Sequence, residues 1–191
     1  MLRQSRYSPW VRHLHWLIFA LVAGALALIY LQDLAPKGSE LRANLKWAHV
    51  QFGIAALLVM LPRLLVRLRH HGDEPPITPS PPRWQVRMSR LIHVTLYALL
   101  FAVPLLGVSM MVTKGTPWDF AGIALPVLPA PDRSLAHAIA EVHETLGNVL
   151  MYLAGFHAAA ALFHHVFQRD DTLRRMLPAR RTALRAGPAG D

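Results

Sequence analysis

The chain has 191 residues, of which 53% are hydrophobic and 16% charged, and it contains no cysteine. The lack of cysteine excludes disulfides, iron–sulfur ligation by the chain and covalent haem attachment through a C-x-x-C-H motif. The net charge of +9 does not indicate nucleic-acid binding, because the basic residues flank apolar runs, where membrane orientation and anionic lipid account for them.

The first apolar run lies between Arg12 and Asp33 and carries no charge. It has features of a secretory signal, with arginines before it and Ala25-Leu26-Ala27 as a candidate cleavage site. However, the run is longer than a signal core, and the triplet lies inside it. We therefore expect a retained membrane helix over about 13–32, with His15 in its first turns.

The second apolar run follows a short polar loop and predicts a helix over about 46–66. It carries His49 near its start, and Gly53 follows one turn later. A glycine at that position lets a flat ligand approach the backbone. At the far end the charge-free core is short, so we expect Arg63 and Arg67 to snorkel toward the membrane surface and lengthen the helix.

The third apolar run predicts a helix over about 90–113, after a proline-rich linker at 75–82 that is extended and does not divide two domains. His93 lies near the start of this helix, with Pro104 and Gly107 near its centre. No histidine lies deep in the run. We therefore expect the helix to pack and shape a cavity without supplying a ligand. The loop after it combines turn signals with apolar residues, which favours a course along the membrane surface.

The fourth apolar run has no charge between Glu144 and Arg169, which is long enough for a membrane span of about 20 residues. It predicts a helix over about 138–168. His143 and His157 are fourteen residues apart, close to four turns, so they share one face about 21 Å apart. The same face carries Gly147, Leu150, Ala154 and Ala161. Small residues leave room for flat cofactors, although on membrane helices they more often mark close helix packing.

The distribution of lysine and arginine predicts the orientation of the four helices. These residues concentrate before the first helix, in the second loop and in the C-terminal tail, and the positive-inside rule then places both termini in the cytoplasm. The predicted fold is an all-α membrane protein. It is an antiparallel bundle of four transmembrane helices in a single domain spanning 1–191, with 169–191 as a basic cytoplasmic tail.

This topology brings four histidines together in two pairs. His15 and His157 lie at the cytoplasmic level, and His49 and His143 lie at the outer level. A six-coordinate haem needs two neutral imidazoles on opposite faces of the porphyrin, and each pair comes from two different helices at one depth. We therefore expect two b-type haems whose iron is bound by these pairs. Arg12, Arg42 and Lys46 are candidate partners for the haem propionates. The alternative is a haemless bundle that uses its histidines for packing, protons or metal.

Several segments resemble the bacterial di-haem cytochrome b561 family. They are His15-Trp16, the AHVQFGI segment around His49, RLLVRL at the end of the second run, GTPW from Gly115 to Trp118, and the HETL and GFHAAAALFHH motifs of the fourth run. The resemblance implies that His15, His49, His143 and His157 are the axial ligands. It also implies an inner-membrane electron carrier coupled to ubiquinone. Some members are described as superoxide oxidases, and the wider group includes b-type subunits of hydrogenases and formate dehydrogenases.

The resemblance leads to a superoxide:ubiquinone oxidoreductase as the expected activity, with an electron-transfer subunit of a larger dehydrogenase or hydrogenase as the alternative. A quinone needs hydrogen-bond donors and protons, and His93, His164 and His165 are candidates near the cytoplasmic surface. At the outer surface, Lys114 and Arg133 are placed to attract a small anion such as superoxide.

Overall fold

Four long helices make up most of the protein. The computed structural model describes residues 6–72 and 74–178, and each of its four helices is long and apolar enough to cross a membrane. This confirms the expected all-α membrane fold. The helices are α1 (Pro9–Leu34), α2 (Glu40–Arg69), α3 (Arg83–Lys114) and α4 (Arg133–Phe163). A π-helical turn η1 (His164–Gln168), a 3-10 turn η2 (Arg174–Met176) and two short strands, β1 (Asp119–Phe120) and β2 (Ile123–Ala124), complete the described structure.

Polar caps extend three of the helices beyond the apolar runs that predicted them. The Ser8 side chain accepts a hydrogen bond from the backbone of α1, which has proline at its first position, and Ser39 and Asp132 cap α2 and α4 in the same way. Such caps satisfy N–H groups that lack a partner inside the helix. At the other end, α2 continues through Pro62 to Arg69. The expected bounds were too short because they followed hydropathy alone.

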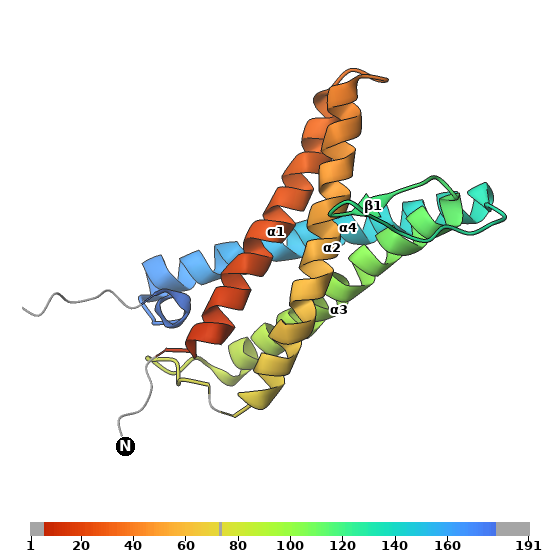
Figure 1. Ribbon diagram of the computed structural model, residues 1–191. Coiled ribbons are helices and arrows are strands. Elements are labelled where there is room, and N and C mark those ends of the chain that lie inside the picture. The colour runs from red at the N-terminus through yellow and green to blue at the C-terminus, as the bar shows by residue number, and fades with distance from the viewer. Residues whose placement is uncertain (1–5, 73, 179–191) are drawn as a thin grey trace, which may run out of the picture.

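The helices form two hairpins, because α1 packs mainly along α2 and α3 along α4 (Figure 1). Residues 6–8, the described residues of the linker (70–72 and 74–82) and the segment 169–178 gather at one end of the bundle, which we call the terminal end (Figure 1). The opposite end, which we call the hairpin end, holds the α1–α2 turn and the α3–α4 loop. In that loop β1 and β2 pair as an antiparallel hairpin, and its Asp119 is bound by Trp47 and Gln51 of α2.

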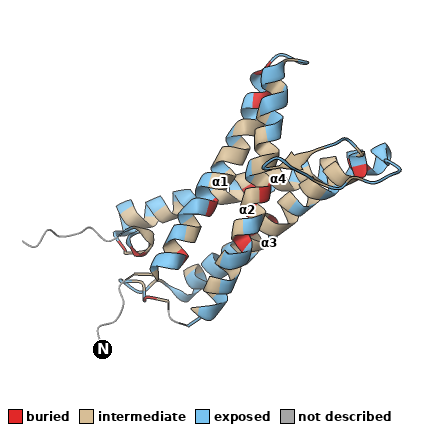
Figure 2. Cartoon of the chain, in the orientation of Figure 1, coloured by how far each residue is buried: buried red, intermediate tan, exposed pale blue. Residues whose placement is uncertain are grey.

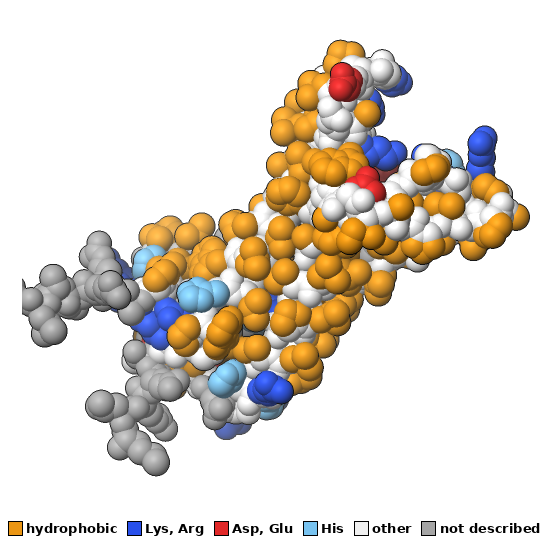
Figure 3. Space-filling view, in the orientation of Figure 1, with side chains coloured by type: hydrophobic (Ala, Val, Ile, Leu, Met, Phe, Trp, Pro, Cys, Tyr) orange, Lys and Arg blue, Asp and Glu red, His pale blue; other side chains and the backbone are white. Residues whose placement is uncertain are grey.

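The surface of the helices is largely apolar. Few residues are buried inside the described structure (Figure 2), and a small cluster of Leu96, Leu99 and Leu150 packs α3 against α4. Large apolar side chains such as Phe19 and Phe156 are more than half exposed. On the face shown in Figure 3, apolar side chains cover the helices and charged ones gather toward the ends. This pattern is the one a bundle surrounded by lipid requires.

The segment after α4 folds back over the terminal end of the bundle. The Tyr7 N–H donates to the Arg175 carbonyl, the Thr78 N–H donates to the Asp171 carboxylate, and the Arg175 guanidinium donates to the Pro75 carbonyl. The residues at 169–178 are therefore packed against the N-terminal segment and the second loop, not extended as a tail. The rest of the expected tail, 179–191, lies outside the described residues.

Asp170 is the buried anchor of this segment, with 3% of its surface exposed. Its Oδ2 accepts a 2.6 Å hydrogen bond from His164 Nδ1, and its Oδ1 accepts one from the Thr172 N–H. Burial by itself raises the pKa of Asp170, but the hydrogen bonds from His164 and Thr172 outweigh burial and hold this pKa below its ordinary value. Because the pKa of Asp170 is lower in the folded protein than in the unfolded chain, the ionised carboxylate stabilises the fold at pH values above the pKa of the unfolded chain. This stabilisation is lost as the pH falls through the pKa of the folded protein.

Replacing Asp170 by asparagine is expected to destabilise the protein by about 1–3 kcal/mol at neutral pH, because the charge-assisted hydrogen bond is lost. The difference from the parent should shrink below about pH 4, where the carboxylate of the unfolded chain is protonated. Thermal unfolding in detergent across this pH range measures both effects. Glu141→Gln is the matched control, since its ion pair with His137 is exposed and such pairs contribute little. Equal stability of the two variants would contradict the anchoring role.

Candidate functional site

His49 of α2 and His143 of α4 face each other toward the hairpin end. Their ring centroids are 6.2 Å apart, and the ring planes cross at 90°. The Nδ1 of His49 is 2.8 Å from the Ala25 carbonyl oxygen, and the Nδ1 of His143 is 2.8 Å from the Val103 carbonyl oxygen. A carbonyl only accepts hydrogen bonds, so both Nδ1 atoms carry the proton and both Nε2 atoms keep a lone pair. This is the state of a histidine ready to bind a metal.

Open space lies beside this hairpin-end pair. Gly53 and Gly147 each follow a ligand candidate by one turn, and a Cβ added at either position would meet no atom within 4 Å. Gly107 of α3 differs, because a Cβ there would lie 3.1 Å from Cε1 and 3.3 Å from Nδ1 of His143. The lack of a side chain at Gly107 therefore lets the His143 ring lie against α3. The two open glycines leave room for a flat group beside the pair.

His15 of α1 and His157 of α4 form the second pair, toward the terminal end. Their centroids are 6.4 Å apart, with ring planes at 79°. The Nδ1 of His15 lies 3.1 Å from Nη2 of Arg63. The His93 ring approaches His157 with a centroid distance of 5.1 Å, while His93 Nδ1 is 2.7 Å from the Ser89 carbonyl oxygen. The terminal-end pair and the side chains that contact it therefore come from all four helices.

Both pairs have the spacing that a bis-imidazole haem requires. A metal–imidazole bond is about 2 Å long and the ring centroid lies roughly 1 Å behind the nitrogen, so imidazoles on opposite sides of one iron have centroids about 6 Å apart. His93 is about an ångström too close to His157 for that role. Among the described residues, no group of three or more His, Cys, Asp or Glu side chains could hold a metal ion. Pairs suffice for haem, since the porphyrin supplies the remaining ligands.

The three histidines expected near a quinone all lie toward the terminal end, in different surroundings. His164 is bound to Asp170. His165 has a buried Nδ1 without a hydrogen-bond partner among the described residues. His93 lies beside His157. Of the three, His165 is the one with a buried polar atom free to meet a ligand.

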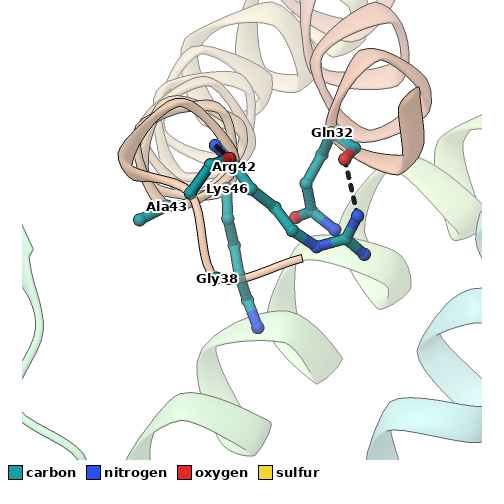
Figure 4. Close-up of a pocket in the computed structure, with 6 residues that line it drawn as sticks. Gln32, Gly38, Arg42, Ala43 and Lys46 are labelled. Carbon is teal, nitrogen blue, oxygen red and sulfur yellow. Dashed lines mark hydrogen bonds between the residues drawn. The ribbon is translucent and has the colours of Figure 1, made fainter. Parts of the chain in front are cut away.

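The cations at the hairpin end have distinct roles. Nη1 of Arg42 donates to the carbonyl of Gln32 (Figure 4) and to that of Ala35. Its Nη2 lies 3.2 Å from Asp33. Arg42 therefore caps the end of α1. Lys46, which forms no hydrogen bond or ion pair among the described residues, lines a pocket of about 340 Å³ beside Arg42 (Figure 4). It is the free cation one turn outward from His49.

Two arginines toward the terminal end do not lie as expected. Nη1 of Arg12 donates to the Leu177 carbonyl at 2.7 Å and so holds the segment after α4. Arg63 does not snorkel, because its guanidinium turns inward to His15. Hydropathy does not predict the inward orientation of Arg63, but its helical spacing from His49 indicates it. Arg63 follows His49 by fourteen residues, which places it on the same face of α2 four turns away.

A family model described as prokaryotic cytochrome b561 matches residues 6–179 of the chain. Cytochrome b561 homolog 1 of Escherichia coli (strain K12) is 36% identical over 177 residues, which is 93% of this chain and 99% of that protein. The probable superoxide oxidase CybB of Yersinia pestis is 34% identical, over 93% of this chain and 98% of its own length. Cytochrome b561 homolog 2 of E. coli is 30% identical over 91% of this chain and 92% of its own length.

Proposed function

This chain belongs to the prokaryotic cytochrome b561 family, membrane b-type cytochromes that transfer electrons, and we propose that it oxidises superoxide and reduces ubiquinone. His49 and His143 would hold one b haem, and His15 and His157 would hold a second. The terminal end faces the cytoplasm and the hairpin end faces the periplasm of a bacterial inner membrane. Arginines concentrated toward the terminal end support this orientation.

One observation carries the proposal, namely two histidine pairs at opposite levels of the bundle, each with the centroid separation of a bis-imidazole site. His143 and His157 share one helix, so their levels are about 21 Å apart along its axis. Haem, when bound, supplies one-electron exchange at each level. The four histidines would hold the two groups at these two levels, and the apolar helices around them exclude water.

The superoxide site of the proposal lies at the hairpin end, beside Lys46. This side chain extends into the pocket of Figure 4 one turn from His49, and Arg42 and Lys114 lie within electrostatic reach of it. A cluster of positive charge raises the local concentration and the encounter rate of a small anion. The relative named as a probable superoxide oxidase, 34% identical over nearly its whole length, supports the same substrate.

The quinone site of the proposal lies at the terminal end. Two superoxide anions each give up one electron and leave as dioxygen, and the two electrons with two protons convert ubiquinone to ubiquinol. His165 donates a hydrogen bond to a quinone carbonyl from its buried, unpartnered ring nitrogen. The His164–Asp170 pair exchanges protons with the aqueous surface, and His93 fixes the surroundings of His157.

Mixing the purified protein with superoxide in a stopped-flow spectrometer tests the proposal. We expect rapid haem reduction that slows as ionic strength rises, because charge steers the encounter. Lys46→Glu should slow the reaction by about tenfold, since it reverses the charge nearest the site. Lys37→Glu is the matched control, because it makes the same charge change in the nearby α1–α2 turn but outside the residues that line the pocket.

Two outcomes would contradict superoxide as the donor. One is the absence of haem reduction by superoxide. The other is an equal effect of Lys46→Glu and Lys37→Glu. Slow reduction together with co-purification of a catalytic subunit would favour the electron-transfer subunit of a larger complex instead.

A further inference from the structure

Arg63 has more buried donors than the described protein can satisfy. Its Nη2 contacts Nδ1 of His15 at 3.1 Å, and its Cζ lies 5.6 Å from the centroid of the Tyr97 ring. Its Nε and Nη1 are buried and have no hydrogen-bond partner among the residues that the structure describes. An arginine side chain has five N–H donors and no acceptor. The Tyr97 side chain also hydrogen-bonds Arg63, but two buried donors still face the interior without an acceptor among the described residues, and such groups are costly to bury.

The contact between Arg63 and His15 is incompatible with iron binding by His15. Arginine only donates, so the contact uses the Nδ1 lone pair of His15 and leaves the ring proton on Nε2. If Nε2 binds iron, the proton moves to Nδ1 and the contact becomes repulsive. If Nδ1 binds iron, its lone pair is no longer available. By either route, a haem on His15 removes the ring-nitrogen acceptor of Arg63 and leaves it the neutral Tyr97 side chain.

The surroundings of Arg63 provide no negative charge to replace that partner. No aspartate or glutamate among the described residues forms an ion pair with Arg63, and Glu74 is paired with Arg67 at 2.8 Å. The other neighbours are Tyr97 and the terminal-end histidines. A buried cation without an anion is strongly destabilising. The group that removes the His15 contact must therefore bring an acceptor of its own.

We propose that Arg63 binds a propionate carboxylate of the haem held by His15 and His157. Haem carries two propionates, and a carboxylate can accept two parallel hydrogen bonds from a guanidinium. A propionate bound to Arg63 would satisfy the buried donors of the guanidinium and also neutralise its charge. The pairing rests on the proposed haem sites. It names a propionate partner other than Arg12, whose Nη1 is bound to Leu177, and Arg42, which is bound at the end of α1.

Redox titration of the purified protein, followed by absorption spectra, tests the pairing. Removing a positive charge beside a haem favours the ferric state, so Arg63→Gln should lower the midpoint potential of one haem and leave the other unchanged. We expect the reduced-to-oxidised ratio of that haem at fixed potential to fall about tenfold, or 59 mV for one electron. Arg63→Lys keeps the positive charge, so it should lower the midpoint potential of that haem less than Arg63→Gln does. Arg67→Gln, one turn away and paired with Glu74, is the matched control.

A second experiment isolates the propionate from other effects of Arg63. Apoprotein of the parent and of Arg63→Gln is reconstituted with haem b or with its dimethyl ester, which lacks the carboxylate charges. The substitution should shift the potential with haem b and shift it little with the ester. Arg63→Gln could lose the terminal-end haem altogether. In that case the parent must still bind haem b more tightly than the ester at the His15–His157 pair, and Arg63→Lys must restore haem binding there.

Equal shifts with haem b and the ester, or unchanged potentials and haem content in Arg63→Gln, would overturn the assignment of Arg63. The proposed function would survive that result, because two haems and their reduction by superoxide do not depend on Arg63. Failure of the parent to bind haem would instead refute the proposed function itself.

Discussion

Replacing His157 by alanine is expected to halve the haem content of the purified protein from two to one. His157 is one of two rings that meet with centroids 6.4 Å apart at the terminal-end level, and an imidazole on one face alone leaves the iron with a vacant position. The bundle should also lose stability, because the haem binds only the folded state.

Haem extracted into pyridine and compared with protein concentration measures this loss. His165→Ala is the matched control, because it removes a histidine eight residues further along the chain and should spare both haems. Two unchanged haems in His157→Ala would refute the assignment of this ligand. A colourless parent protein from haem-replete cells would contradict all four ligand assignments and favour the haemless bundle.

Replacing Gly107 by valine is expected to remove the other haem, although Gly107 is not a ligand. A Cβ at this position already lies 3.1 Å from Cε1 of His143, and the two methyl groups of valine add bulk to that Cβ. The ring must turn away from α3 and give up its hydrogen bond to the Val103 carbonyl. This bond holds the proton on Nδ1 and orients the ring, so its loss takes Nε2 out of line with the iron.

Absorption and paramagnetic resonance spectra measure the effect on the haem held by His49 and His143, which should be lost or become high-spin. Gly107→Ala should give a smaller change of the same kind, because a single methyl needs only a few tenths of an ångström. Gly155→Val is the matched control, since a Cβ at Gly155 meets no atom within 4 Å. A normal low-spin signal from both haems in Gly107→Val would contradict the contact with His143.

The sequence determined the four helices and the positions of the four histidines along them. Long apolar runs have one stable form in a membrane, because backbone groups must be satisfied within the helix itself. Helical rise and chain reversal then set the level of each histidine. His15 and His157 therefore meet at one level and His49 and His143 at another, as topology alone predicted. The capped starts of the helices escaped detection because they depend on polar contacts.

The tertiary structure decided which groups surround the histidines. Ala25 and Val103 accept hydrogen bonds through backbone carbonyls, and every residue carries a carbonyl, so no residue type marks them in advance. Arg63 turns inward to His15, whereas Arg67, one turn later, pairs with Glu74. Hydropathy treats both as arginines at a helix end. Helical spacing places Arg63 on the face of His49, but the packing of α2 against its neighbours decides that its guanidinium reaches His15 while that of Arg67 reaches Glu74.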